Sequence, residues 1–257
     1  MNSLFSRLRK LFSSREEIVD SHLINKVLTA QKFKELEQII KIPIVHKSYY
    51  VQALMHRSFL EDLEENNVSN ERMEYLGDSV LSLVVAEYLF KNFPNEDEGF
   101  LTKVRAKLVN RFALSDAADE ITLERFVLIN QNLSNSFSRA SKTVLSDAFE
   151  ALIGAIYLDN DLSTAKRFIH EFLIDPIVKD GDYLKDENYK SQLLEYAQAN
   201  KLDNPNYVVI KEEGPQHDRV FTVKVNVGEN FSGVGEGKNK KAAEQNAAKS
   251  TLQIINK

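Results

Sequence analysis

The spacing of apolar residues divides the chain into a long helical part and a short C-terminal part that mixes helix and strand. Apolar positions recur every three or four residues over residues 23–42, 70–90, 101–114, 146–159 and 162–174, which predicts five helices. Pro43 and the Asp175-Pro176 pair are expected to end two of them, because proline has no amide proton to donate. No segment before residue 200 alternates as a strand does, so we expect this part to be all-helical.

The C-terminal part has a different periodicity. Residues 189–199 and 240–255 are helical in pattern, whereas residues 207–210, 220–227 and 230–235 alternate like strands, with glycine-containing turns between them. The polar segment 180–186 is typical of a linker. The sequence therefore predicts a basic N-terminal extension (residues 1–20), an all-α domain (21–179), the linker (180–186) and a small α+β domain of order α-β-β-β-α (187–257).

Composition narrows the chemistry that this chain is able to perform. The 257 residues, of which 43% are hydrophobic, suffice for two modest cores. The sequence contains no cysteine, which excludes disulfides, thiolate zinc sites and cysteine nucleophiles and suits a reducing, cytoplasmic environment. The net charge of −5 disfavours a polyanionic partner. From Asp186 onward, however, acidic and basic residues balance, so the negative charge belongs to the first part.

The predicted helix 70–90 begins with three carboxylates on one face. At ~100° per residue, Glu71, Glu74 and Asp78 lie together, while apolar residues, including Met73, Leu76, Val80 and Val84, take the opposite side. Clustered carboxylates repel one another, and their oxygens suit Mg²⁺ or Mn²⁺. The alternative is that these acids only cap and solvate the start of a helix.

The predicted helix 146–159 repeats this construction. Asp147 and Glu150 come first, and an apolar run follows them. If the two helices pack side by side, Glu74, Asp78, Asp147 and Glu150 would converge on one divalent cation. A cation held in this way is what metal-assisted hydrolysis of a phosphodiester requires.

Both acidic segments resemble those of the ribonuclease III family. Residues 70–81, Asn-Glu-Arg-Met-Glu-Tyr-Leu-Gly-Asp-Ser-Val-Leu, resemble the signature of its endonuclease domain, and residues 146–159 resemble its second acidic block. Residues 49–61 look like the family's early helix with the loop that follows, in which we interpret His56 and Arg57 as structural. The resemblance implies Mg²⁺-dependent cleavage of double-stranded RNA that leaves 5′-phosphate and 3′-hydroxyl ends.

The resemblance also assigns roles to individual residues. We expect Glu74, Asp147 and Glu150 to hold metal, with Asp78 beside them as a further ligand that orients or activates water. Glu71 supports the acidic cluster. Glu98 matches a family glutamate that joins this cluster, although it is equally explained as a helix-start acid. The family works as a homodimer, and Tyr75 matches an aromatic residue that inserts into the partner; alternatively, Tyr75 packs within its own core.

One segment departs from the family pattern. Family members usually have a glycine-rich loop and an arginine before the second acidic helix, but residues 129–143 contain no glycine. Arg139 or Lys142 takes the place of that arginine. Before the domain, residues 1–20 are too short and too interrupted for a signal peptide or a membrane-spanning helix. They form either a membrane-surface helix or a frayed basic extension that contacts RNA, and we favour the second.

The C-terminal part resembles a double-stranded-RNA-binding domain. The matching residues are Gly214-Pro215-Gln216-His217, the turn at residues 233–237 and the segment 238–248. Lysines at a helix N-terminus favour phosphate, and duplex RNA is recognised by its shape, its 2′-hydroxyls and its phosphates. We expect RNA contacts from Lys238, Lys240, Lys241, His217 and Glu195; Leu194 replaces a polar residue that family members often have before that glutamate.

Residues 233–239 superficially look like a nucleotide-binding P-loop, but the spacing is one residue short and Asn239 replaces the required Ser or Thr. We therefore expect no nucleotide cofactor. The sequence predicts an endoribonuclease of double-stranded RNA that acts in rRNA and mRNA processing, without a membrane partner. Two alternatives remain: an RNA-binding protein of the same fold that does not cleave, and a metal-dependent hydrolase of small phosphates, which would leave the C-terminal domain without a role.

Overall fold

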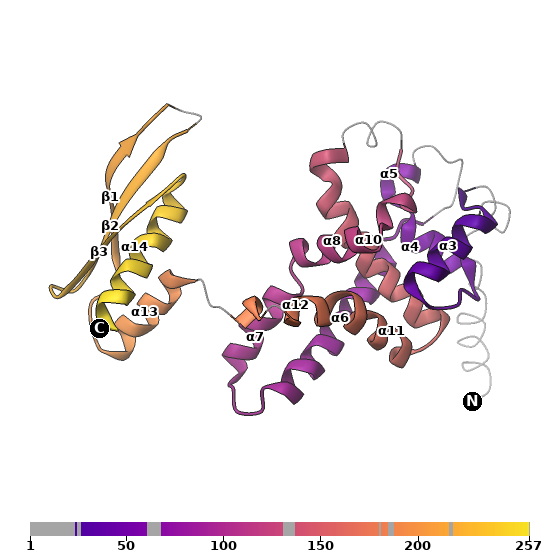
Figure 1. Cartoon of the computed structure of the whole chain (residues 1–257), viewed down its shortest axis with the longest axis horizontal. Coiled ribbons are helices and arrows are strands. Elements are labelled where there is room, and N and C mark those ends of the chain that lie inside the picture. The colour runs from indigo at the N-terminus through magenta and orange to yellow at the C-terminus, as the bar shows by residue number, and fades with distance from the viewer. Residues whose placement is uncertain are drawn as a thin grey trace, which may run out of the picture. The chain divides into compact units, whose positions relative to one another are not determined.

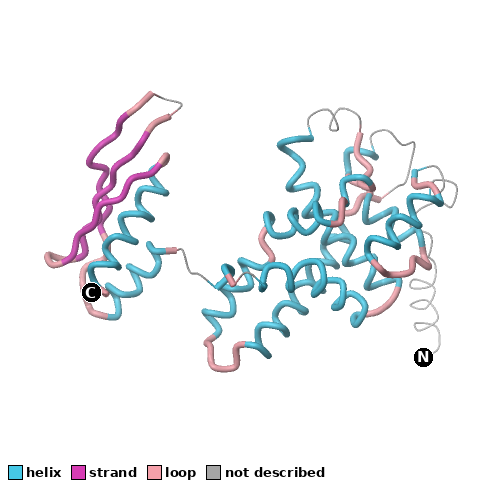
Figure 2. The backbone as a smooth tube through the Cα atoms, viewed as in Figure 1, coloured by secondary structure: helices cyan, strands magenta, loops and turns pink. Residues whose placement is uncertain are grey.

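The structure is a computed structural model that describes residue 24 and residues 27–60, 68–130, 137–179, 181–184, 188–215 and 218–256. The chain divides into two compact units, with the boundary between Leu184 and Lys185 (Figure 1). The first unit is helical, and the second contains a three-stranded sheet (Figure 2). The predicted fold class, all-α followed by α-β-β-β-α, is confirmed. The predicted N-terminal extension lies outside the described residues.

The first unit consists of helices joined by short turns. Its α-helices are α3 (Ala30–Ile40), α4 (Lys47–Leu54), α5 (Arg57–Leu60), α6 (Glu71–Asn92), α7 (Glu98–Leu108), α8 (Arg111–Glu120), α10 (Phe137–Asp159), α11 (Leu162–Ile169) and α12 (Asp175–Lys179). Short turns of other helix types are η1 (Leu123–Arg125), the π-helical η2 (His170–Ile174) and η3 (Asp182–Leu184). Among the described helices, none has the length and hydropathy needed to cross a bilayer.

Two predicted helices begin or break where polar side chains cap the backbone. The helix predicted over residues 23–42 is interrupted: Ile24 and Val27 are helical, but α3 begins only after Thr29, whose hydroxyl accepts the Lys32 amide. The predicted helix 101–114 is two helices, α7 and α8. Asn110 has an extended backbone between them and its side chain accepts the amides of Phe112 and Ala113. Capping therefore overrides continuous apolar periodicity at both places.

Two other helix boundaries differ from the predicted ones: one helix begins earlier, and another continues further along the chain. Helix α10 begins at Phe137, so the second half of the glycine-free segment 129–143 is helix rather than loop. The helix expected to stop at Asp175-Pro176 continues into α12. The π-helical turn before it bonds the Asp175 amide to the His170 carbonyl, and Pro176 then lies in a first turn, where its missing amide proton costs no helical bond.

The core of the first unit is built around α10, whose apolar face is buried against α6, α8 and α4. Helices α6 and α10 approach most closely at Gly77 and Gly154. A Cβ atom on Gly77 would lie 1.7 Å from the Glu150 carbonyl oxygen, and one on Gly154 would lie 2.6 Å from the Met73 carbonyl oxygen. Only glycine permits backbones this close. The contact brings the acidic first turns of α6 against the acidic part of α10.

The second unit packs two helices on one face of an antiparallel sheet. Its elements are α13 (Tyr189–Ala199), β1 (Asn206–Glu213), β2 (Val220–Val227), β3 (Phe231–Gly237) and α14 (Lys240–Ile255), with strand order β1-β2-β3. Strand β1 is longer than predicted and bulges between Val209 and Lys211. On β3, a Cβ atom on Gly235 would lie 2.1 Å from the Ala247 nitrogen of α14, so glycine again permits the close packing.

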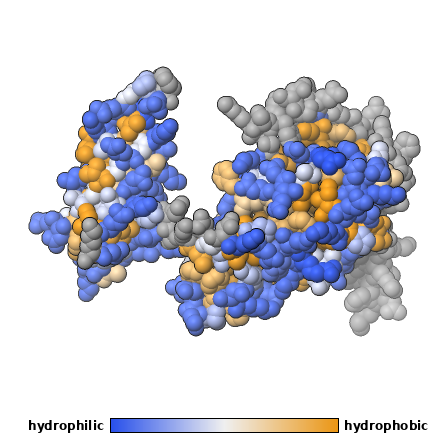
Figure 3. All heavy atoms as spheres, viewed as in Figure 1, coloured by the Kyte–Doolittle hydropathy of each residue, from blue (hydrophilic) through white to orange (hydrophobic). Residues whose placement is uncertain are grey.

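On the face shown in Figure 3, hydrophilic residues predominate on both units, with apolar side chains between them. In the second unit, Val208, Ile210 and Val234 are among the exposed apolar residues of the sheet. Val208 and Val234 flank Lys224 in the strand register. Exposed apolar residues of this number are ordinary on a protein surface.

We predict that Gly77→Ala destabilises the first unit, because its methyl group would overlap the α10 backbone. The expected loss exceeds about 3 kcal/mol, or a fall in Tm of at least roughly 6 °C. Gly99→Ala is the matched control, since its Cβ would meet only the Asp97 side chain, at 3.3 Å. Thermal unfolding followed by circular dichroism measures both. Equal Tm values for the two variants would contradict the proposed role of this crossing.

Candidate active site

A cavity of about 480 Å³ opens at the start of α6. Three segments form its walls: the turn between α4 and α5, the first two turns of α6, and residues 143–150 of α10. The lining residues are His56, Arg57, Asn70, Glu71, Glu74, Tyr75, Asp78, Thr143, Val144, Asp147 and Glu150. It contains every acid predicted from helices 70–90 and 146–159.

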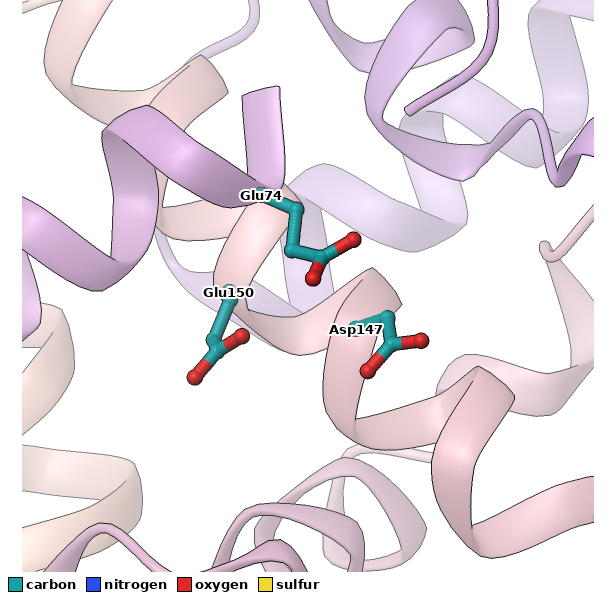
Figure 4. Close-up of side chains that lie close together, drawn as sticks. All are labelled: Glu74, Asp147 and Glu150. Carbon is teal, nitrogen blue, oxygen red and sulfur yellow. The ribbon is translucent and has the colours of Figure 1, made fainter. Parts of the chain in front are cut away.

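Three of these acids converge closely. One carboxylate oxygen from each of Glu74, Asp147 and Glu150 lies within 4.8 Å of the other two, and all three side chains are half-buried. Glu74 comes from α6 and the other two come from successive turns of α10, and the carboxylates face the same opening (Figure 4). Oxygen donors suit a hard divalent cation, and these three residues would hold it. The donor set therefore fits a metal.

Burial raises the pKa values of all three acids, and repulsion by neighbouring carboxylates adds to this effect at Glu150 and Glu74. The pKa of Glu150 rises to about 8, mainly through burial and then through the charges of Asp78, Glu74 and Asp147. Burial, followed by Asp147, raises the pKa of Glu74. Burial also raises the pKa of Asp147. The cluster without metal thus favours protons, and a bound divalent cation would replace them.

The remaining predicted acids differ in their relation to the cavity. Asp78 is exposed and lines it next to the converging three. Glu71 lines it as well and accepts from the Ser69 hydroxyl. Glu98 does not line the cavity; it is the first residue of α7 and its carboxylate accepts from the Thr102 hydroxyl. Within one chain, the structure brings Glu71 and Asp78, but not Glu98, to the site.

Asn70 occupies the N-cap position of α6, but its side chain does not cap the helix. Its backbone is helical and its side chain makes no capping bond. The side chain is buried, at 3% exposure, and in the described part of the chain its amide nitrogen has no hydrogen-bond partner. The backbone amide of Asn70 instead donates to the Met55 carbonyl at 2.9 Å, which ties the start of α6 to the end of α4.

Two cavity residues were interpreted from sequence as purely structural. His56 and Arg57 both line the cavity, and an Arg57 Nη1 atom lies 4.0 Å from Glu71. The sequence does place them in segment 49–61, which resembles the family and comes just before the acidic helix. Spacing alone does not show which wall of a cavity a turn will form, because that depends on contacts with distant residues.

Tyr75 is 78% exposed at the edge of the same cavity. The alternative that it packs within its own core is therefore wrong.

Lys142, next to the cavity residue Thr143, lies 3.7 Å from Asp116 and has its ammonium over the Phe112 ring at 5.0 Å. The side chain of Arg139 lies outside the described residues.

The predicted RNA-binding residues of the second unit lie on its surface. Lys238, Lys240 and Lys241 are exposed around the start of α14, where the Asn239 side chain caps the helix by accepting the Ala242 amide. Glu195 lies on the exposed side of α13 beside Leu194, which is 37% exposed. His217 falls outside the described residues.

The fold and the site together define a class of protein: a helical domain with a cluster of converging carboxylates, joined to a small α-β-β-β-α domain. The family model described as Ribonuclease-III-like matches residues 44–177, and the one described as double-stranded RNA binding motif matches residues 189–255. The chain therefore belongs to the ribonuclease III family, whose members are metal-dependent endoribonucleases that act on double-stranded RNA.

Individual relatives support this assignment. A protein named Ribonuclease 3 from Syntrophomonas wolfei is 43% identical over 232 residues, which span 89% of this chain and 96% of that protein. One from Borreliella burgdorferi is 42% identical over 206 residues, or 79% and 83% of the two chains. The crystal structure of the nuclease domain of ribonuclease III from Campylobacter jejuni has a TM-score of 0.52 at 36% identity, and covers 57% of this chain and 96% of that one.

We predict that the metal-free protein loses stability as pH rises from about 5 to about 8. The folded-state pKa of Glu150 is raised to about 8 from 4.5, so in this window the folded state keeps a proton that the unfolded state has lost. The slope for one proton is at most about 1.4 kcal/mol per pH unit, and partial exposure reduces it. Urea unfolding in EDTA measures it.

Glu150→Gln serves as the comparison for this pH profile. The variant keeps a neutral group of the same size, so its free energy of unfolding should fall less steeply and exceed that of the wild type near pH 8. Parallel profiles for the two proteins would contradict the assignment of the slope to Glu150.

Proposed function

We propose that this chain hydrolyses phosphodiester bonds of double-stranded RNA with Mg²⁺ and that the carboxylate cavity is the catalytic site. The observation that carries the proposal is the convergence of Glu74, Asp147 and Glu150 oxygens within 4.8 Å. Mg²⁺ prefers carboxylate oxygens, and Mn²⁺ is a plausible substitute. The half-buried acids repel one another, so the cavity is strongly favoured to bind a cation rather than to hold water alone.

Each acid has a distinct role in this proposal. Glu74, Asp147 and Glu150 hold the metal, which when bound lowers the pKa of water and offsets charge on the phosphoryl oxygens. Asp78 is a further ligand that orients the attacking water and accepts its proton. The water oxygen bonds to phosphorus as the bond to the 3′-oxygen breaks, and the 3′-oxygen takes up a proton from solvent and leaves as a hydroxyl. Glu71 and its neighbours hold the start of α6 in place.

The products follow from which bond breaks. Cleavage of the bond between phosphorus and the 3′-oxygen leaves a 5′-phosphate and a 3′-hydroxyl. We propose rRNA and mRNA duplexes as substrates and the cytoplasm as the place of action. The cysteine-free composition and the bacterial relatives named Ribonuclease 3 support this setting.

The second unit supplies affinity for duplex RNA in this proposal. Lys238, Lys240 and Lys241 bind phosphates at the start of α14, where free helix amides add to their charge. His217 and Glu195 contact the minor groove, with 2′-hydroxyls and base edges as partners. This unit reads duplex shape, so cleavage sites depend on geometry more than on sequence.

We further propose that the chain acts as a homodimer in which each site cuts one strand. Tyr75, Leu83 and Phe90 are large, exposed residues of α6, and together they provide an apolar surface for a second copy. A second nuclease-domain structure of Campylobacter jejuni ribonuclease III, with a TM-score of 0.50 at 38% identity, is described as flexible in a region involved in its dimer formation. In this arrangement Glu98 is available to the acidic cluster of the partner.

An end-labelled RNA duplex tests cleavage. We expect the wild type to cut it with Mg²⁺ and to stop in EDTA, and we expect Glu150→Gln to cut at least about 10³-fold more slowly, because one metal ligand loses its charge. Gel-shift affinity for the duplex should stay within about twofold. Glu124→Gln is the control, since Glu124 is an exposed acid that does not line the cavity.

The outcome separates cleavage from binding. A wild-type protein that binds duplex RNA but cuts it with neither Mg²⁺ nor Mn²⁺ would favour the non-cleaving alternative. A substrate preference for small phosphate esters, unaffected by competing duplex RNA, would favour the small-phosphate hydrolase.

Dimerisation is tested separately with Tyr75→Ala, which removes a side chain that is 78% exposed. We expect a shift toward monomer in sedimentation velocity, with the dissociation constant raised by at least about tenfold. Val45→Ala, which truncates another exposed apolar residue, of 67% exposure, is the control and should leave the dimer intact. Identical sedimentation of both variants and the wild type would argue against Tyr75 as an interface residue.

A further inference from the structure

The turn between α4 and α5 is fixed in place by hydrogen bonds to two other parts of the chain. The His56 amide donates to the Leu128 carbonyl at 3.0 Å, and the Leu128 amide donates to the Leu54 carbonyl at 2.7 Å. Met55 forms an isolated parallel bridge with Leu128 and its carbonyl accepts from Asn70, at the start of α6. The turn therefore keeps a constant position relative to the acids of α6.

The His56 ring is oriented by Ser58. Its Nδ1 atom lies 2.9 Å from the Ser58 hydroxyl oxygen and accepts the Ser58 amide at 3.2 Å. An amide only donates, so Nδ1 carries no proton and the proton of the neutral ring is on Nε2. The position of Ser58 is itself fixed, because its hydroxyl oxygen accepts a hydrogen bond from the backbone amide of Asn130 at 3.3 Å. Both Ser58 and Asn130 are buried, at 9% exposure.

The walls of the cavity differ in polarity. The walls from α6 and α10 present carboxylates, whereas the α4–α5 turn presents the Arg57 guanidinium and the His56 imidazole. Both residues, together with Arg111, lie close enough to Asp147 to act against the effect of burial on its pKa. A phosphodiester brings a negative charge into a site that already holds several. Hydrogen-bond donors facing the acids are what such a substrate requires.

We propose that His56 is a further catalytic residue, which donates a hydrogen bond from Nε2 to a non-bridging oxygen of the scissile phosphate. Ser58 and Asn130 are positioning residues, which fix the tautomer and the ring plane. The inference rests on the proposed RNA cleavage at the carboxylate cavity. Because Nδ1 accepts from the Ser58 amide, Nε2 carries the ring proton and is the donor nitrogen of a residue that lines the cavity.

Two substitutions separate the two ring nitrogens. In His56→Asn, the side-chain amide lies near the position of Nδ1, so the contact with Ser58 is kept and the Nε2 donor is lost. In His56→Gln, the longer side chain carries an N–H group to the position of Nε2. We expect the asparagine variant to lose about 10- to 100-fold in kcat, with duplex affinity and Tm unchanged, and the glutamine variant to retain activity within about fivefold.

His46→Asn is the matched control. His46 precedes α4 at its other end, and its Nδ1 atom lies 2.7 Å from Asp159. It does not line the cavity, so its replacement should leave the cleavage rate at the wild-type value. A loss of activity in this control as large as that in His56→Asn would show that the rate responds to general disturbance of α4, and would overturn the inference.

A sulfur substitution tests the contact directly. RNA duplexes with a single phosphorothioate at the scissile position are prepared as separate Rp and Sp isomers. Sulfur accepts hydrogen bonds poorly, so one isomer should slow the wild type more than it slows His56→Asn, and the two effects should be non-additive. A residue that only supports the fold would give additive effects with both isomers.

The outcomes distinguish this inference from the function on which it rests. A wild-type protein that fails to cut any duplex overturns both. A wild type that cuts, beside a stable His56→Asn variant that cuts equally fast, overturns only the role of His56. Loss of activity in both variants, with additive sulfur effects, also overturns it and assigns His56 to the fold. Loss in the asparagine variant alone, with coupling to one isomer, supports it.

Discussion

The site depends on one contact, the crossing of α6 and α10 at Gly77 and Gly154. A Cβ atom at either position would overlap the backbone of the other helix, so any larger residue would force the helices apart. Glu74 lies one turn from Gly77, and Glu150 lies one turn from Gly154 on α10. Because the acids are placed by two rigid helices, the convergence of their oxygens within 4.8 Å is a consequence of backbone packing rather than of flexible side chains.

This contact creates an electrostatic cost that protonation or a bound cation relieves. Burial and repulsion raise the pKa of Glu150 to about 8 and also raise that of Glu74, while burial raises that of Asp147. A protein that needed these residues only for stability would gain from replacing them with apolar groups. In the proposed function this arrangement is preorganisation, because the folding energy of the helical core holds the repelling groups together before a metal and a phosphate bind.

The second unit also uses close packing at glycines, but for a different purpose. Glycines on β3 let α14 lie directly against the sheet, and the start of that helix presents Lys238, Lys240 and Lys241 to solvent. Here the charges are exposed and separated, so they need no compensating ion. The division between a buried acidic centre and a solvated basic surface explains how a chain with a net charge of −5 belongs to a family that acts on RNA.

The sequence by itself determined both fold classes and the five acids of the cavity, because helical faces and i, i+3 or i, i+4 spacing are local properties. It did not determine that Thr29 and Asn110 interrupt helices, because the capping preference of single residues competes with the apolar periodicity. It also did not determine that α10 begins at Phe137. It also missed the place of His56 and Arg57 at the cavity. That place depends on the pairing of Met55 with Leu128, a long-range contact whose partners only the tertiary structure brings together.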